Sequence, residues 1–138
     1  MIRDMFTRLS YRQRRRAGNR YEYYIAWKLR NEGWTVDART KYRQYDRGID
    51  LIATKDGKVR YVQCKGWAAK KFLNENIIDQ LYGSVAYQVG PENLLQNQMF
   101  IYSSAQPTLY AREHAKRLNI ELFHEPYPSF WKRKKSID

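Results

Sequence analysis

The chain has a single cysteine, Cys64, among its 138 residues. One cysteine excludes an intramolecular disulfide, and the sequence shows no spacing typical of a zinc site. It also lacks an apolar run near the ~20 residues that a membrane-spanning helix needs, and it shows no signal peptide. We therefore expect an intracellular protein without a membrane partner.

Acidic residues are few compared with basic ones. The chain has 26 Lys and Arg against 14 Asp and Glu, which gives a net charge of +12. A composition with 43% hydrophobic and 15% aromatic residues predicts one folded domain with a core rather than general disorder. A compact domain this basic usually binds a polyanion, and nucleic acid is the first candidate. The alternative is a ribosome-associated or merely soluble basic protein.

Hydrophobic periodicity predicts an α/β domain without internal repeats. Helical spacing predicts helices over residues 19–32, from after Asn74 to about 88, and over 107–118. Gly33 is expected to end the first helix, and Asn74 to cap the start of the second. Short apolar runs predict strands over residues 34–43, 98–102 and 120–123, in addition to a hairpin over 46–65. The resulting order, α-β-β-β-α-β-α-β, indicates a mixed central sheet flanked by helices.

Two basic segments flank this domain. We interpret residues 1–17 as a basic N-terminal arm, residues 18–125 as the domain, and residues 126–138 as a basic C-terminal tail. The alternative for the arm is a frayed, solvated terminus.

The hairpin is centred on Asp56-Gly57, a pair that favours a two-residue type I′ turn because both positions need positive φ. Such a turn pairs Lys55 with Lys58, Ile52 with Tyr61, and Asp50 with Gln63. Side chains alternate along a strand. Asp50 and Gln63 are therefore expected on one face with Lys65, and Ile49, Leu51 and Ala53 on the other.

The open end of this hairpin thus gathers a carboxylate, an amide and an ammonium group. A metal-dependent phosphodiesterase needs oxygen ligands for Mg²⁺ or Mn²⁺ and a cation near the attacking water or the phosphate. Asp50, the amide oxygen of Gln63 and the backbone carbonyl of Cys64 can supply the ligands, and Lys65 the cation. The alternative is a surface hairpin with a polar end, and the spacing alone does not decide between the two.

Glu22 borders the apolar stripe of the first predicted helix, because Ile25, Ala26 and Leu29 follow it by three, four and seven residues. A carboxylate there is costly unless it is paired or metal-bound. Glu22 could join the metal site through a water molecule, or it could pair with Arg20 or a nearby lysine. Gln80, on the second predicted helix, is interpreted as a surface residue in preference to a partner of the hairpin.

Basic and aromatic residues outside the hairpin suit a nucleic-acid contact surface. They fall in the loop after the hairpin, in the arm and in the tail: Trp67, Lys70, Lys71; Arg12, Arg14, Arg15, Arg16; Lys132, Arg133, Lys134, Lys135. Trp67 could alternatively be a core residue.

The motifs Gly48-Ile49-Asp50 and Gln63-Cys64-Lys65 resemble those of the PD-(D/E)xK nuclease superfamily, in the D…QxK variant of Mrr-type restriction endonuclease domains. Residues 18–33, with Glu22, are similar to the first helix of that family. The segments 99–104, 111–115 and 119–122 are similar to its closing strand, helix and strand. The resemblance covers roughly residues 18–123, so it makes residues 18–125 a nuclease-like domain.

This resemblance implies the restriction-endonuclease-like fold, an αβββαβ core followed by a further helix and a short strand. It implies DNA as partner, Mg²⁺ or Mn²⁺ as cofactor, and Asp50, Gln63 and Lys65 as catalytic residues, with Glu22 in the helical acidic position. Because Gln63 is neutral, metal affinity is expected to be weaker than in an all-carboxylate site. The leading hypothesis is a metal-dependent DNA endonuclease. The alternatives are a Holliday-junction-resolvase-like enzyme, which would need a homodimer, and an inactive DNA-binding module.

Overall fold

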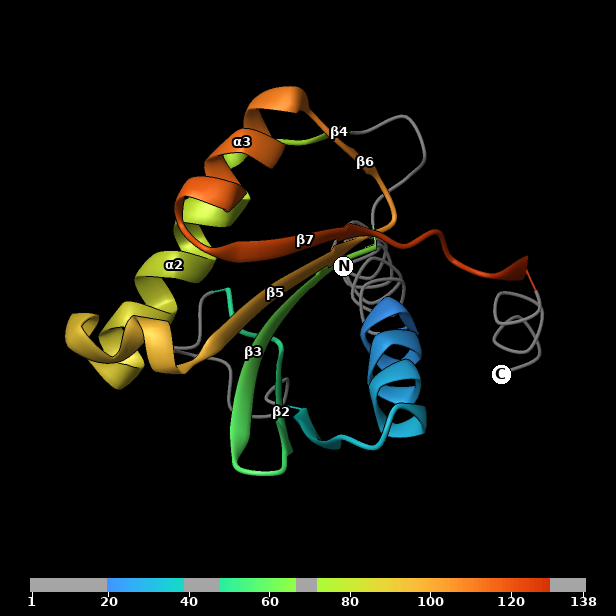
Figure 1. Cartoon of the computed structure of the whole chain (residues 1–138). Helices are drawn as coiled ribbons and strands as arrows, with labels where there is room; N and C mark the ends of the chain where they lie inside the picture. Colours follow the sequence, from blue (N-terminus) through green and yellow to red (C-terminus); the bar gives the residue numbers. More distant parts are fainter. Residues whose placement is uncertain (1–19, 39–47, 67–71, 130–138) are drawn as a thin grey trace, which may run out of the picture.

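The structure, a computed structural model, describes residues 20–38, 48–66 and 72–129. Within these ranges a five-stranded sheet has the order β1-β2-β3-β5-β7. The strands are β1 (Thr35–Ala38), β2 (Leu51–Lys55), β3 (Lys58–Lys65), β5 (Gln98–Ser103) and β7 (Ile120–His124). β1, β2 and β3 pair antiparallel, whereas β3, β5 and β7 run parallel. Helices lie on both sides of the sheet (Figure 1), which confirms the predicted fold class.

The β2–β3 hairpin forms with the predicted turn, but its ladder ends at the pair Leu51–Val62, so the predicted pair of Asp50 with Gln63 is not part of it. Asp56 and Gly57 have φ values of 51° and 77°, as a type I′ turn requires. Lys55 pairs with Lys58 and Ile52 with Tyr61. The two-residue turn therefore sets the register that carries Asp50 and Gln63 to the same end of the hairpin.

One face of the sheet is covered by the N-terminal helix, which includes residues 20–31. Gly33 follows it with φ +95°, and the Nζ of Lys55 donates a 2.7 Å hydrogen bond to the carbonyl of Glu32. These features match the stop predicted at Gly33. The helix is thereby tied to β2 at one end and lies along the sheet toward the open end of the hairpin.

The opposite face is covered by α2 (Glu75–Val89) and α3 (Leu109–Arg117). Asn74 caps α2 as predicted, because its side chain accepts a 3.1 Å hydrogen bond from the N–H of Asn76. Gly90 ends α2, and a short 3-10 helix, η2 (Pro91–Gln96), follows it.

The predicted start of the last helix is wrong by two residues. Pro107 belongs to a short strand, β6 (Gln106–Pro107), that pairs with β4 (Phe72–Leu73). Thr108 is the N-cap, because its hydroxyl accepts a 3.0 Å hydrogen bond from the N–H of Ala111. The cap and the β4 pairing together outweigh the preference of proline for the first helical position.

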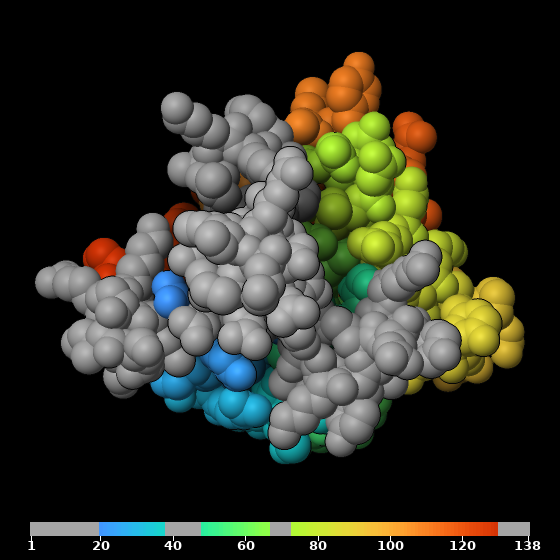
Figure 2. Space-filling view, turned by 180° about the vertical axis from the view of Figure 1, so that it is seen from behind, coloured from blue at the N-terminus to red at the C-terminus, as the bar shows by residue number. Residues whose placement is uncertain are grey.

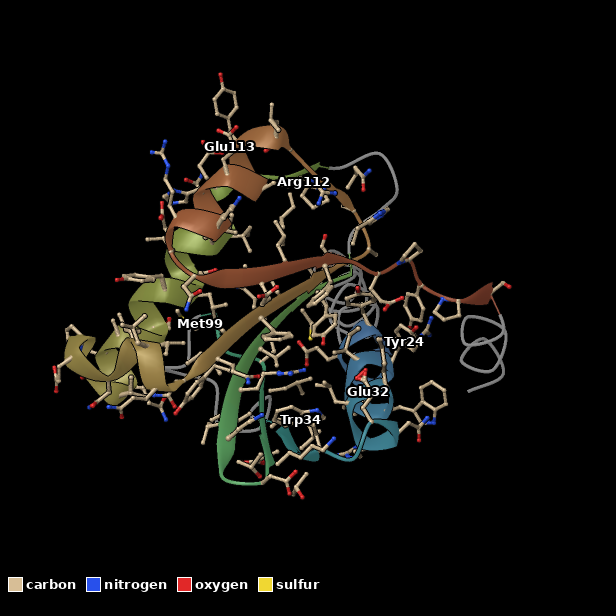
Figure 3. All side chains as sticks on the ribbon, viewed as in Figure 1. Tyr24, Glu32, Trp34, Met99, Arg112 and Glu113 are labelled. Carbon is tan, nitrogen blue, oxygen red and sulfur yellow. The ribbon has the colours of Figure 1, made fainter. Side chains whose placement is uncertain are left out.

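The sheet separates two cores. Ile25 and Leu29 of the N-terminal helix are fully buried against Leu51, Val62 and Cys64. On the other face, α2 and α3 pack on residues such as Tyr61, Met99 and Ile101. Figure 3 labels Met99 in one core and Tyr24 and Trp34 in the other. Each fully buried aliphatic side chain contributes about 1.5–3 kcal/mol to stability, so both helix layers are firmly attached to the sheet.

No helix in the described part of the chain is long and apolar enough to cross a membrane.

Candidate active site

Gln63 occupies the centre of the predicted site. Its side chain is 1% exposed, and it faces α2, where its Nε2 donates a 3.1 Å hydrogen bond to the Oε1 of Gln80. The Oε1 of Gln63 is buried and has no hydrogen-bond partner. An unsatisfied buried acceptor costs about 1–3 kcal/mol. The fold therefore keeps a carbonyl-type oxygen available at this point.

Asp50 lies at an irregularity just before β2. Its N–H donates a 2.8 Å hydrogen bond to the carbonyl of Val62, although the ladder pairs Val62 with Leu51. Ile49 packs in the α2 core, whereas Leu51 packs in the core of the N-terminal helix. Residues two apart in a regular strand share a face, so the chain bulges at Asp50. The predicted placement of Ile49 beside Leu51 is therefore wrong.

The bulge sets the direction of the Asp50 carboxylate. Its Oδ2 accepts a 2.8 Å hydrogen bond from the N–H of Cys64, between Gln63 and Lys65 on β3. In an extended strand the N–H and the carbonyl of one residue point to the same side. The carbonyl of Cys64 is therefore directed toward the Asp50 side of β3.

Glu22 reaches the same region from the N-terminal helix. It is 8% exposed and follows Tyr21, which packs so closely on Gly66 that a Cβ on Gly66 would overlap its ring. Gly66 directly follows Lys65. The helix thus brings the turn that carries Glu22 near the end of β3.

The pKa of the Cys64 thiol depends on nearby charged side chains. Burial raises its pKa well above the ordinary value, Asp50 and Glu22 raise that pKa further, and Lys65 lowers it. Such charge effects weaken with distance. The charged groups of Asp50, Glu22 and Lys65 are therefore all near enough to the Cys64 thiol to affect its pKa.

Lys65 ends β3 and is half-buried. Its carbonyl accepts hydrogen bonds from the N–H of Ser104 at 2.9 Å and from the hydroxyl of Ser104 at 3.3 Å. The backbone at Lys65 is thus held by the β5 side of the sheet, independently of its ammonium group.

Gln80 is the partner that the sequence interpretation missed. Its side chain is exposed, as interpreted, but it also contacts Gln63. Gly48 passes close to it, since a Cβ on Gly48 would lie 3.0 Å from the Cγ of Gln80. Figure 2 shows the teal start of the hairpin beside the yellow-green surface of α2. The sequence carried one signal for this contact. Gln80 follows the apolar residues Ile77 and Ile78 in the helix and precedes further residues that are buried.

Substitution of Gly48 by alanine should destabilise the fold by about 1–3 kcal/mol, because Gly48 has φ +92° and a Cβ would also lie 3.1 Å from the carbonyl oxygen of Gln80. Urea unfolding measures this change. Gly83→Ala on α2 is the control, because nothing lies within 4 Å of its added Cβ and alanine favours a helix by about 1 kcal/mol over glycine. A Gly48→Ala protein as stable as the original would contradict the close packing.

The remaining predicted contact residues lie outside the described part of the chain: Trp67, Lys70, Lys71, Arg12, Arg14, Arg15, Arg16, Lys132, Arg133, Lys134 and Lys135.

The sequence matches the profile of a family described as restriction endonuclease, with the Mrr-type catalytic domain, over residues 14–126. The chain belongs to this restriction endonuclease family. A search of curated proteins finds no match.

A solved structure shares the fold. A protein of unknown function, AF1548, aligns with a TM-score of 0.62 at 16% identity, over 87% of this chain and 66% of that one. EndoMS in its apo form and a repair endonuclease from Pyrococcus abyssi each reach a TM-score of 0.44, at 13% and 15% identity. They cover 57% and 58% of this chain, and 32% and 33% of their own. This chain thus spans less than two thirds of each neighbour, and the two weaker likenesses have no bearing on its function.

The described part of this restriction endonuclease domain offers few clustered side chains for a metal centre. Within the described ranges, no group of three or more His, Cys, Asp or Glu side chains is placed to hold a metal ion. Any cation in the described part of the chain would therefore need ligands besides carboxylate, imidazole and thiolate groups.

Proposed function

We propose that this restriction endonuclease domain is a divalent-metal-dependent DNA endonuclease that hydrolyses phosphodiester bonds. The observation that supports this most strongly is the buried, unpartnered Oε1 of Gln63 at the hairpin end that also holds Asp50. Oxygen is the ligand atom that Mg²⁺ and Mn²⁺ prefer. A cation at this point would remove the cost of the unsatisfied acceptor.

The residues present fit such a cation. Asp50 would supply a carboxylate, Gln63 its Oε1, and Cys64 its backbone carbonyl, with Glu22 contributing through a water molecule. When bound, the metal supplies charge stabilisation at the phosphate and a more acidic water molecule. Its affinity should be modest, because a glutamine replaces one negative charge.

The chain's own groups divide the remaining work. Lys65 would orient the attacking water or offset the negative charge that develops on the phosphate. The net charge of +12 would attract the DNA backbone, and this attraction should weaken as salt is raised. DNA would thus be held mainly by charge, and the hairpin end would act on one phosphate.

One observation favours a second candidate. The absence of a three-residue acidic, His or Cys cluster in the described ranges suits a DNA-binding module without catalysis. Incubation of plasmid and branched DNA with Mg²⁺ or Mn²⁺ separates the candidates. Cleavage of both substrates supports a general endonuclease, and cleavage of branched DNA alone supports a resolvase-like enzyme. Binding without cleavage supports the inactive module and overturns the proposal.

Substitutions at Gln63 test the metal site directly. Gln63→Glu restores a carboxylate and should lower the Mg²⁺ concentration needed for half-maximal cleavage. Gln63→Ala removes the oxygen ligand and should raise that concentration and reduce the rate. Mg²⁺ titrations of plasmid cleavage measure both effects, with circular dichroism as the check on folding. An unchanged Mg²⁺ requirement in Gln63→Ala would exclude Gln63 as a ligand.

A further inference from the structure

The side-chain amide of Gln63 has one donor end and one acceptor end, and only the donor end has a hydrogen-bond partner. The donor end is bound by the Oε1 of Gln80 at 3.1 Å, and the buried acceptor end has no partner. If the amide turned over, its NH₂ group would occupy the position of the free oxygen. A metal ion binds the oxygen and not the NH₂ group. The orientation of this amide therefore decides whether residue 63 can be a ligand.

Gln80 is the residue that accepts the hydrogen bond from this amide. We infer that Gln80 is a positioning residue: by accepting the hydrogen bond from Nε2 of Gln63, it presents the Oε1 of Gln63 to the metal ion. The inference rests on the proposed function, because it needs a cation at the hairpin end. Gln80 itself need not touch that cation.

The packing around Gln80 supports a defined position. A Cβ on Gly48 would lie 3.0–3.2 Å from the Cγ, carbonyl oxygen and carbonyl carbon of Gln80, so the hairpin lies directly against this turn of α2. Ile78 and Leu81, on either side of Gln80, are fully buried and anchor that turn in the core. The side chain of Gln80 is nevertheless exposed. Substitutions there should therefore leave the fold intact.

Three substitutions separate orientation from other effects. Gln80→Glu keeps an acceptor, so Gln63 should stay oriented and metal binding should be kept or improved. Gln80→Met keeps the length of the side chain but accepts no hydrogen bond. Gln80→Lys supplies only donors, which favour the turned-over amide. Loss of a partner that orients a metal ligand typically costs about 10- to 100-fold in affinity, so we expect Gln80→Met and Gln80→Lys to weaken Mn²⁺ binding by that order.

Calorimetric titration of the full chain with Mn²⁺ alone measures these affinities without reference to cleavage. Asn76→Glu and Asn76→Lys are the charge controls, because Asn76 is exposed one turn earlier on α2. The charge change at Asn76 should shift Mn²⁺ affinity less than the same change at Gln80. Thermal unfolding without metal should give similar midpoints for all variants.

A double substitution provides the decisive comparison. Both oxygens of a carboxylate are acceptors, so turning the group over still leaves an oxygen in the same position. In a Gln63→Glu background, Gln80→Met should therefore have little effect on Mn²⁺ affinity, although it costs about tenfold or more when residue 63 is glutamine.

The outcomes distinguish the inference from the proposed function. Failure of the unsubstituted chain to bind Mn²⁺ would overturn both. Normal Mn²⁺ binding by Gln80→Met, an equal loss in Gln80→Glu, or the same loss in the Gln63→Glu background would each overturn the role of Gln80 and leave the metal site standing. Loss of affinity in both Gln80→Met and Gln80→Lys supports the role of Gln80, provided that the effect of Gln80→Met disappears in the Gln63→Glu background.

Discussion

Replacement of Asp50 by asparagine should abolish detectable DNA cleavage while the fold survives. Asp50 is the one carboxylate of the hairpin set, and its Oδ2 accepts the N–H of Cys64 at 2.8 Å. Asparagine can accept the same hydrogen bond but carries no charge. Removal of an outer partner of a metal ligand typically costs about 10- to 100-fold. The loss of cleavage rate in Asp50→Asn should be larger. Single-turnover plasmid cleavage at saturating Mg²⁺ measures it.

The Asp50→Ala variant separates the chemical role from the structural one. Alanine leaves the N–H of Cys64 without its charged acceptor, and a hydrogen bond to a charged group contributes about 1.5–3 kcal/mol. Asp50→Ala should therefore be both inactive and less stable, whereas Asp50→Asn should be inactive and stable. Asp56→Asn is the matched control, because it makes the same change at the hairpin turn, where asparagine is also favoured. Cleavage at the normal rate by Asp50→Asn would refute the proposed site.

Replacement of Lys65 by methionine should reduce the rate of cleavage by about 10²–10³-fold and leave DNA affinity nearly unchanged. A group that stabilises charge developing at the phosphate acts mainly in the transition state. In ground-state binding it is one positive charge among 26 Lys and Arg residues. The backbone of Lys65 is held through its carbonyl by Ser104, so the strand should keep its shape without the ammonium group.

Lys58→Met is the control for this substitution, because Lys58 is an exposed residue at the opposite end of the same strand. It should cleave DNA at the normal rate. Fluorescence anisotropy gives DNA affinity, and single-turnover kinetics give the chemical rate. A parallel loss of affinity and rate in Lys65→Met would make Lys65 a phosphate anchor instead of a catalytic group.

Local sequence signals predicted the elements that carry the site. The Asp56-Gly57 turn fixes the hairpin register because both residues adopt the positive φ that the turn needs, and the pairs Ile52–Tyr61 and Lys55–Lys58 follow from it. The ends of two helices, at Asn74 and Gly33, were also predictable. These features depend on residues close together in the chain.

Other features depended on contacts between distant segments. Strand alternation predicted Ile49 beside Leu51, but the two enter different cores because the chain bulges at Asp50. Pro107 appeared to begin a helix, but β6 pairs with β4, thirty or more residues earlier in the sequence. In both cases packing with another layer outweighed the local preference.

The sequence by itself thus determined a basic α/β domain and a hairpin whose open end carries Asp50, Gln63, Cys64 and Lys65, because turn chemistry and strand alternation act over a few residues. Only the tertiary structure decided how these groups are aimed. The bulge turns Asp50 toward the N–H of Cys64, and Gly48 lets α2 approach until Gln80 binds one end of the Gln63 amide. Both depend on the packing of helices against the sheet, which is a property of the whole fold and not of any one segment.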